Sequence, residues 1–223
     1  MTIQAWTEFI DLSHKEAPVR GYLHGVVGGG RDCLILTHGA GANCQSPLLT
    51  ALAEAFDAAG VTVLRCDLPF RQARPHGPPM RGSAERDQAG LRAAAQAMRR
   101  GGAGSVFLGG HSYGGRQASM LAAGEPELVE ALLLLSYPLH PPKQAENLRT
   151  QHLPSLRVPA FFVHGTCDGF GTAAEMQSAL ELIPARTELL PVEGAGHELL
   201  KKNREQFIEQ VTARFLAFAR ALG

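Results

Sequence analysis

Short runs of continuous apolar residues alternate along this chain with longer stretches in which apolar residues recur at helical spacing. Such alternation predicts buried parallel strands joined by crossover helices, the arrangement of an α/β protein. The predicted strands are Cys33 to Thr37, Val61 to Cys66, Val106 to Leu108, Ala131 to Ser136, Ala160 to His164 and Thr187 to Val192. The predicted helices are Pro47 to Ala59, Ser83 to about Arg100, Arg116 to Ala123, Thr172 to Leu182 and Glu198 to Leu222.

The beginning of the chain follows a different pattern. Trp6 to Leu12 and Val19 to Val27 predict two strands joined by a polar turn, an antiparallel hairpin at one edge of the sheet. The proline-rich stretch from Tyr137 to Pro159 has room for only one or two turns of helix. We therefore expect one domain over residues 1–223: a mostly parallel sheet with an antiparallel edge hairpin, helices on both faces and no lid domain.

Composition limits the classes of function. The chain is 45% hydrophobic and 19% charged, which predicts a globular protein. Lysine plus arginine equals aspartate plus glutamate at 21 each, so no net charge attracts nucleic acid or an anionic membrane. We see no secretory signal in Met1 to Ser13, no apolar stretch long enough to span a bilayer, and no paired cysteine motif. These observations predict a cytoplasmic protein without nucleic-acid or membrane partners.

One turn carries a chemical signature. Gly110, Ser112 and Gly114 form a G-x-S-x-G motif between a predicted strand and a predicted helix. A tight turn in this context lifts the central side chain clear of the sheet, and the flanking glycines leave room for it. The helix dipole favours negative charge at that point. We interpret Ser112 as a nucleophile; the alternative is a glycine-rich turn followed by a serine N-cap.

A serine nucleophile needs an oriented base, and the loops after parallel strands open onto the same crevice. His197 lies in a glycine-containing loop directly after the last predicted strand, and we predict that it is the general base. Asp168 follows the strand Ala160 to His164, and we predict that it orients the histidine. The order Ser112, Asp168, His197 is typical of such turns. The alternatives are an ordinary loop histidine and an aspartate that forms a turn beside Gly169.

Two backbone donors are needed where negative charge develops on the substrate. We expect them to be the N–H of Tyr113, the residue after the nucleophile, and the N–H of Ala40 in the flexible loop after the strand Cys33 to Thr37.

A proline-rich loop from Arg71 to Arg81 contains three arginines. Arg71 and Arg74 are candidates to bind an anionic group of the substrate, because a guanidinium pairs bidentately with carboxylate or phosphate. His140 is a further candidate at the same mouth. The alternative is a solvated surface loop.

From about Gly21 to its end, the chain resembles an α/β-hydrolase and is most similar to the small dienelactone-hydrolase-like branch without a lid. Three segments, Thr37 to Gly41, Tyr137 to Pro142 and Gly165 to Gly171, resemble a subgroup that includes small bacterial proteins and a regulatory subunit of the non-specific-lethal chromatin complex. Dienelactone hydrolase uses cysteine where this chain has Ser112, so the resemblance does not imply its particular substrate.

The sequence therefore predicts a serine hydrolase that cleaves an ester or related small-molecule acyl compound through an acyl-enzyme, with no metal or organic cofactor. Two alternatives stay open: an interaction or regulatory protein on a hydrolase fold, and cofactor-free perhydrolysis by the same three side chains.

Overall fold

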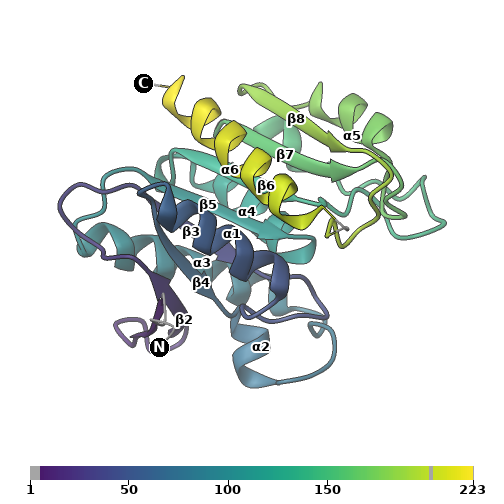
Figure 1. Cartoon of the computed structure of the whole chain (residues 1–223). Helices are drawn as coiled ribbons and strands as arrows, with labels where there is room; N and C mark the ends of the chain where they lie inside the picture. The colour runs from purple at the N-terminus through teal and green to yellow at the C-terminus, as the bar shows by residue number, and fades with distance from the viewer. Residues whose placement is uncertain (1–5, 201–202, 223) are drawn as a thin grey trace.

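The computed structural model describes residues 6–200 and 203–222. Its strands form one sheet of eight in the order β1-β2-β4-β3-β5-β6-β7-β8 (Figure 1). The strands are β1 (Trp6–Asp11), β2 (Val19–His24), β3 (Cys33–Thr37), β4 (Thr62–Cys66), β5 (Val106–His111), β6 (Ala131–Leu135), β7 (Ala160–Gly165) and β8 (Thr187–Val192). The β1–β2 and β2–β4 pairs are antiparallel and the other pairs are parallel, as the sequence predicts.

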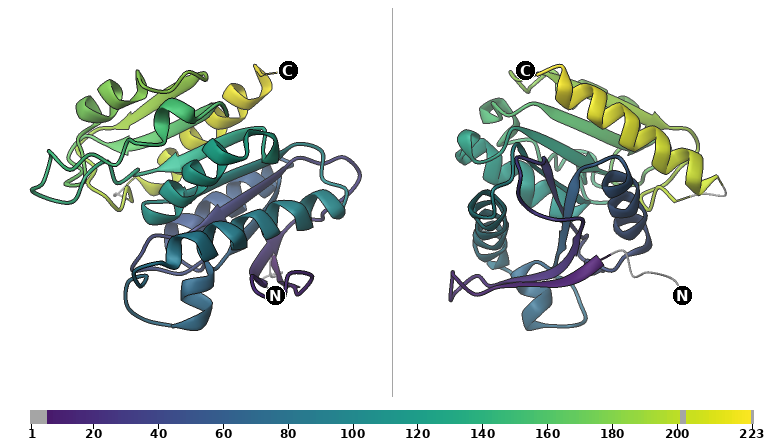
Figure 2. Two further views of the ribbon diagram at one scale, coloured as in Figure 1. Left: turned by 180° about the vertical axis from the view of Figure 1, so that it is seen from behind. Right: turned by 60° about the vertical axis from the view of Figure 1, so that its left-hand side comes forward.

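Helices cover both faces of the sheet (Figure 2). They are α1 (Pro47–Ala58), α2 (Pro69–Ala73), α3 (Ser83–Arg100), α4 (Tyr113–Gly124), α5 (Ala173–Leu180) and α6 (Arg204–Arg220), with short 3₁₀ turns η1 (Pro126–Leu128) and η2 (Leu153–Ser155). α1 and α6 pack on one face, while α3, α4 and α5 pack on the other. The predicted α/β fold with an antiparallel edge hairpin is confirmed.

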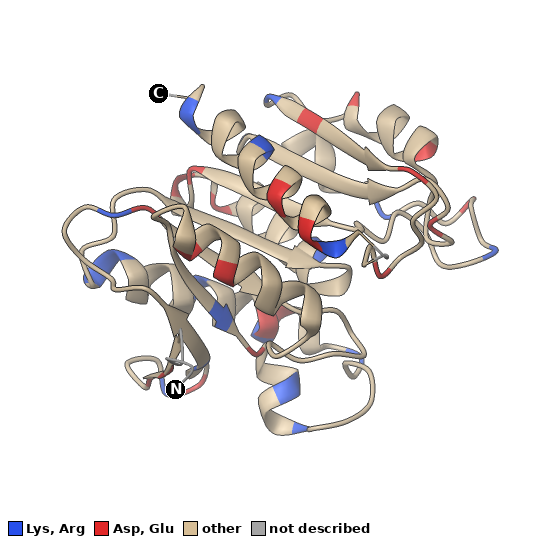
Figure 3. Ribbon diagram, in the orientation of Figure 1, with Lys and Arg blue, Asp and Glu red and all other residues tan. Residues whose placement is uncertain are grey.

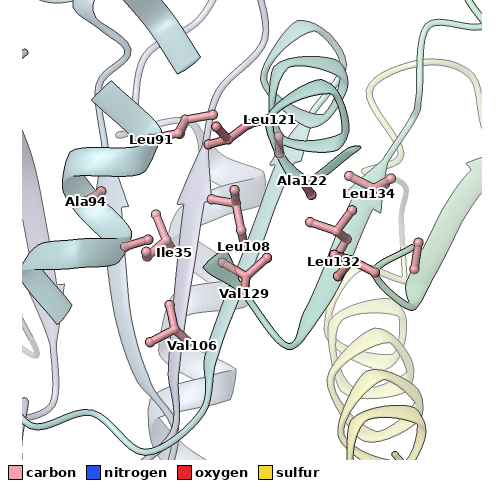
Figure 4. Packing of buried hydrophobic residues seen from close by; sticks show 14 of the residues in the cluster. Ile35, Leu91, Ala94, Val106, Leu108, Leu121, Ala122, Val129, Leu132 and Leu134 are labelled. Atoms are coloured by element: carbon pink, nitrogen blue, oxygen red, sulfur yellow. The ribbon is translucent and has the colours of Figure 1, made fainter. Parts of the chain in front are cut away.

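Each face of the sheet contributes its own hydrophobic layer. On the α3–α4 side, Leu91 and Leu121 pack toward Ile35, Leu108 and Leu132 of the strands (Figure 4). On the opposite side the core contains aromatic pairs. The Phe215 ring of α6 meets the rings of Phe56 and Phe107 edge to face, at centroid distances of 5.8 and 5.5 Å. Because strands buried on both faces must be apolar throughout, their sequences lack alternation.

The register of the parallel strands brings their carboxyl ends to one edge. Thr37 of β3 pairs with Gly110 of β5, and His111 pairs with Leu135 of β6. Gly165 of β7 pairs with Val192 of β8. The loops that follow these strands therefore gather above the same end of the sheet.

Several predicted bounds differ from the structure: the strand predicted to end at Val27 ends at His24, and the strand predicted to end at Leu108 continues to His111. The predicted loop after β4 contains α2, which starts at Pro69, because proline is well suited to the first position of a helix. The last helix begins at Arg204, six residues after the predicted start at Glu198. Leu199 has a left-handed φ of 60°, which is incompatible with an α-helix there.

Charged residues of both signs are spread over helices, strands and loops (Figure 3). No helix within the described ranges combines the length and hydropathy needed to cross a membrane.

Candidate active site

Ser112 lies between β5 and α4 with φ 51° and ψ −117°, a backbone conformation that residues with a side chain rarely adopt. Such strain costs about 1 to 3 kcal/mol and persists only where the surroundings enforce it. Here the Ser112 N–H donates to the Leu135 carbonyl at 2.8 Å, which ties the turn to β6. A Cβ on Gly114 would lie 2.5 Å from the His38 carbonyl oxygen, so only glycine allows this approach.

A hydrogen-bonded chain joins Ser112, His197 and Asp168. The Ser112 hydroxyl oxygen lies 2.8 Å from His197 Nε2, and His197 Nδ1 lies 2.8 Å from Asp168 Oδ2. Because a carboxylate only accepts, Nδ1 carries the imidazole proton and Nε2 is left to accept from the serine hydroxyl. The structure thus brings together three residues that are 85 and 29 positions apart.

All three groups are largely shielded from solvent, and the aspartate is the most deeply buried. The Asp168 side chain is 0% exposed, the His197 side chain 18% and Ser112 9%. Burial raises the pKa of Asp168, but the hydrogen bonds from His197 and from the Phe170 N–H outweigh it, together with the favourable electrostatic interaction with the His197 and His164 rings, and leave the pKa below its ordinary value. Asp168 is therefore ionised at neutral pH and faces the imidazole from the inside.

The His197 loop is held by two groups that sequence reasoning did not assign. His111 Nε2 donates to the His197 carbonyl oxygen at 2.8 Å. The Phe170 ring stacks against the His197 ring at 4.2 Å with the planes 32° apart. His111 could have been selected from the sequence because it directly precedes Ser112. Nothing in the sequence singles out Phe170.

His164 is buried on the inner side of the aspartate. Its Nε2 donates to the Gly171 carbonyl at 2.6 Å and lies 3.7 Å from Asp168 Oδ2. Burial lowers the pKa of His164, so the ring is neutral at neutral pH. It fixes the loop that carries Asp168, a role consistent with its position at the end of β7.

The loop after β3 runs against Ser112, because a Cβ on Gly39 would lie 3.4 Å from Ser112 Cβ. His38 Nε2 accepts from the Leu68 N–H at 3.1 Å, so its Nδ1–H donates to the Gly39 carbonyl at 2.8 Å. The Ala40 N–H has no acceptor among residues 6–200 and 203–222. The Tyr113 N–H lies in the first turn of α4, where no intrahelical acceptor exists.

Arg71 is turned into this loop and is 5% exposed. Its Nε donates to the Ala42 carbonyl at 2.7 Å, and one terminal nitrogen donates to the Ala40 carbonyl at 2.8 Å. Further bonds reach the carbonyls of Arg74 and Gly77. The expectation that Arg71 binds an anionic substrate does not fit this geometry, because its donors are engaged by backbone oxygens. Arg74, in contrast, is exposed.

His140 also differs from expectation. It is 6% exposed, and its Nδ1 donates to the Pro141 carbonyl at 2.8 Å. Its Nε2 is buried and faces Glu175 at 3.6 Å. The ring therefore points into the protein beside α5, and the prediction that it lines the mouth does not fit this position.

The Tyr113 side chain braces the start of α4. Its hydroxyl donates to Asp87 Oδ2 at 2.7 Å, and Asp87 Oδ1 accepts from the Phe70 N–H at 3.0 Å. Burial raises the pKa of Asp87, and burial together with the Asp87 bond raises that of Tyr113. These two bonds join α2, α3 and α4 next to Ser112.

A strained serine after a central strand of a mostly parallel sheet, with post-strand loops supplying aspartate and histidine, defines the α/β-hydrolase class of fold. A sequence model of the alpha/beta hydrolase domain matches residues 30–219, and the chain belongs to this family.

Solved structures of similar fold cover nearly the whole chain. A dienelactone hydrolase from Anabaena variabilis is 22% identical with a TM-score of 0.71, over 96% of this chain and 99% of that one. Est1E from Butyrivibrio proteoclasticus, solved with ferulic acid bound, is 17% identical with a TM-score of 0.74, again over 96% and 99%. An esterase from Pyrococcus furiosus is 16% identical with a TM-score of 0.73, over 97% and 90%. At these identities the likeness is one of fold.

A curated relative matches a short stretch only. The polyketide synthase ThaQ of Burkholderia thailandensis is 41% identical over 64 residues, which are 29% of this chain and 3% of that protein. The chain thus spans a small fraction of that relative's length. No comparison tests the finer resemblance to the chromatin-complex subunit, which stays a prediction.

Proposed function

We propose that the protein is a serine hydrolase that cleaves an ester or a related acyl compound through an acyl-enzyme on Ser112. The observation that carries this proposal is the hydrogen-bonded chain from the Ser112 hydroxyl through His197 to the buried Asp168 carboxylate. The esterases among the structures of similar fold support the reaction class.

In the first half of the reaction, Ser112 Oγ attacks the substrate carbonyl carbon while its proton passes to His197 Nε2. The carbonyl π electrons move onto oxygen, giving a tetrahedral oxyanion. When the oxyanion collapses, the bond to the leaving oxygen breaks and that oxygen takes the proton from Nε2. An alcohol departs and the acyl group stays on Ser112.

In the second half, water attacks the acyl carbon and gives a proton to His197 Nε2. Collapse of the second oxyanion breaks the bond to Ser112 Oγ, which recovers the proton, and a carboxylic acid leaves. The sum is ester plus water to alcohol plus acid. Asp168 holds Nδ1 protonated throughout and stabilises the imidazolium formed in each half.

We assign the oxyanion contacts to the N–H groups of Tyr113 and Ala40. Both donors are free of acceptors within the described part of the chain, and the loop that carries Ala40 lies against Ser112. Loss of one such donor typically lowers kcat by about 10²- to 10³-fold.

Ser112→Ala tests the proposal with a short p-nitrophenyl ester as substrate. We expect turnover to fall by about 10³-fold or more while the unfolding temperature is retained, because the nucleophile is lost and the glycine-rich turn is kept. Residual activity within tenfold of the wild type would remove Ser112 from the mechanism. A stable wild-type protein without esterase activity that retains a protein partner would favour the interaction-protein alternative.

Arg74 remains our candidate for a contact with an anionic group of the substrate. It is exposed, and it forms no ion pair with any described residue.

A further inference from the structure

Two arginines that the proposed mechanism does not use, Arg116 and Arg149, lie close enough to each other beside α4 for their charges to interact. Arg116 follows Ser112 by one turn of α4, and its N–H donates to the Ser112 carbonyl at 3.0 Å. Arg149 lies at the end of the loop after β6, where its N–H donates to the Leu139 carbonyl at 2.7 Å. α4 packs against η2, the turn that follows Arg149. Both side chains are half-buried.

The groups between the two arginines are neutral. The Tyr137 hydroxyl donates to the Arg149 carbonyl at 2.6 Å, and burial raises its pKa to about 12 although both arginine charges oppose this. His152 Nε2 is hydrogen bonded to Ser119 Oγ at 2.8 Å. Burial and the Arg116 charge lower the pKa of His152 to about 4, so the ring carries no charge at neutral pH.

No carboxylate compensates this pair of cations. Within the part of the chain that the structure describes, neither Arg116 nor Arg149 forms an ion pair. The two also repel each other: burial, and then the charge of Arg116, lower the pKa of Arg149. Two cations brought together and partly desolvated destabilise a fold unless an anion joins them.

Arg116 also holds a donor without an acceptor. Its Nε is buried and has no hydrogen-bond partner among the described residues. A buried polar donor is almost always satisfied, and leaving one on a charged group unsatisfied is costly. An anion bound in the fork of the guanidinium engages Nε and a terminal nitrogen together.

We propose that Arg116 and Arg149 bind a carboxylate or phosphate group of the substrate, so that the preferred substrate is an acyl compound with an acidic group a few bonds from the scissile carbonyl. The inference rests on the proposed function, because an anionic group held by Arg116, one helical turn after Ser112 in α4, belongs to the substrate only if Ser112 attacks that substrate. The site differs from the loop arginines: Arg71 makes four hydrogen bonds to carbonyls, whereas the Arg149 guanidinium makes one long bond, to the Pro138 carbonyl at 3.4 Å, and Arg74 lies on another loop.

Matched esters test the proposal. Mono-p-nitrophenyl glutarate carries a carboxylate, whereas p-nitrophenyl butyrate is a neutral ester of similar length. We expect Arg116→Gln and Arg149→Gln each to raise KM for the glutarate ester by about tenfold or more, since a hydrogen bond to a charged group contributes about 1.5 to 3 kcal/mol. KM and kcat for the butyrate ester should stay within twofold. The matched control is Arg157→Gln, which removes an exposed arginine at the opposite end of the sheet. It should leave KM and kcat unchanged for both esters.

Direct binding separates this inference from the proposed function. Glutarate and inorganic phosphate are titrated calorimetrically into the Ser112→Ala variant and into the variant that also carries Arg116→Gln. The anion with the higher affinity shows whether the site prefers a carboxylate or a phosphate. Binding that disappears with Arg116→Gln supports the site even if the wild type cleaves no ester. Three results would overturn the proposal. The first is an equal change in KM for both esters in Arg116→Gln and Arg149→Gln, and the second is no binding of either anion by Ser112→Ala. The third is a preference for the glutarate ester that only Arg74→Gln abolishes.

Discussion

Ser112 adopts a left-handed backbone conformation that its neighbours must enforce. The enforcement comes from close backbone contacts rather than from side chains. Three glycines around Ser112 have no room for a side chain. A Cβ on Gly110, Gly114 or Gly115 would lie 2.5 to 2.8 Å from a backbone atom of the turn itself or of His38. The backbone conformation of Ser112 therefore requires glycine, with no side chain, at these three neighbouring positions.

Gly114→Ala tests this dependence. The new methyl group would lie 2.5 Å from the His38 oxygen and 2.7 Å from Thr37 Cγ2, so we expect a loss of about 1 to 3 kcal/mol in the free energy of unfolding, measured in urea. Gly124→Ala, at the end of the same helix with open space around it, is the control and should leave stability unchanged or slightly raised. Equal effects of the two substitutions would contradict the account of the turn.

Asp168→Asn tests the orientation of the base. An amide in place of the carboxylate can present an N–H to His197 Nδ1 and select the imidazole tautomer that cannot accept from Ser112. We expect kcat for a p-nitrophenyl ester to fall by about 10³- to 10⁴-fold with the structure retained. Asp11→Asn on the edge hairpin is the control and should keep full activity. A fall of less than tenfold would mean that Asp168 does not orient the base.

The sequence locates polar residues at strand ends but not the direction of their side chains. Ser112, Asp168 and His197 could be selected because each follows a buried apolar strand, and the parallel sheet brings such positions together. Arg71 and His140 were assigned to the mouth by the same reasoning, yet both side chains turn inward to backbone carbonyls. Whether a loop side chain points outward or inward depends on the local backbone geometry of the loop, which the spacing of apolar residues does not predict.

At the scale of elements, the loop after β3 and helix α2 form one unit. Arg71 of α2 binds the carbonyls of Ala40 and Ala42, and His38 binds that of Gly39. These bonds fix the peptide planes of the loop that lies against Ser112. Helix α2 thus fixes, through Arg71, the loop that carries Ala40, the proposed oxyanion donor.

Arg71→Gln tests this positioning role. A glutamine cannot span the four carbonyls, so we expect kcat to fall by about tenfold to a hundredfold, less than for outright loss of an oxyanion donor, with KM nearly unchanged. Arg81→Gln, an exposed arginine further along the segment, is the control. Arg71→Lys should recover little, because an ammonium lacks the fork. A rise in KM with unchanged kcat would instead indicate direct contact with substrate.

Element boundaries were predictable where a single signal ends the element. β3 and β8 have their predicted limits, since continuous apolar or β-branched runs are bounded there by polar or glycine-containing segments. The start of α6 was not predictable, because the sequence from Glu198 onward is compatible with a helix. Only the left-handed φ of Leu199, seen in the structure, shows that the helix begins later, at Arg204. α2 was missed because five residues are too few to show helical periodicity.

At the scale of the whole molecule, several buried histidines couple stability to pH. Burial and the charge of Arg65 lower the pKa of His24 from 6.5 to about 4, and His152 shows a shift of the same size. An unfolded chain takes up these protons near pH 6.5, whereas the folded protein takes them up only near pH 4. Between these values the unfolded state binds more protons, so stability falls as the pH falls.

Urea unfolding at a series of pH values between 4 and 6.5 measures this effect. The free energy of unfolding of the wild type should decrease steadily as the pH is lowered through this window. In His24→Gln the decrease should be smaller, because one of the coupled groups is gone, while His14→Gln in an exposed turn should behave as the wild type. A wild-type stability that is constant over the window would contradict the burial of neutral histidines.

The central claim is that Ser112 is a nucleophile activated by His197 and Asp168, and covalent labelling tests it most directly. The folded protein is treated with a fluorophosphonate, and the modified residue is located by mass spectrometry. We predict a single adduct on Ser112 in the wild type, little or none in Asp168→Asn over the same time, and none in Ser112→Ala. A folded wild-type protein that stays unlabelled, or that carries the adduct on another residue, would contradict the account.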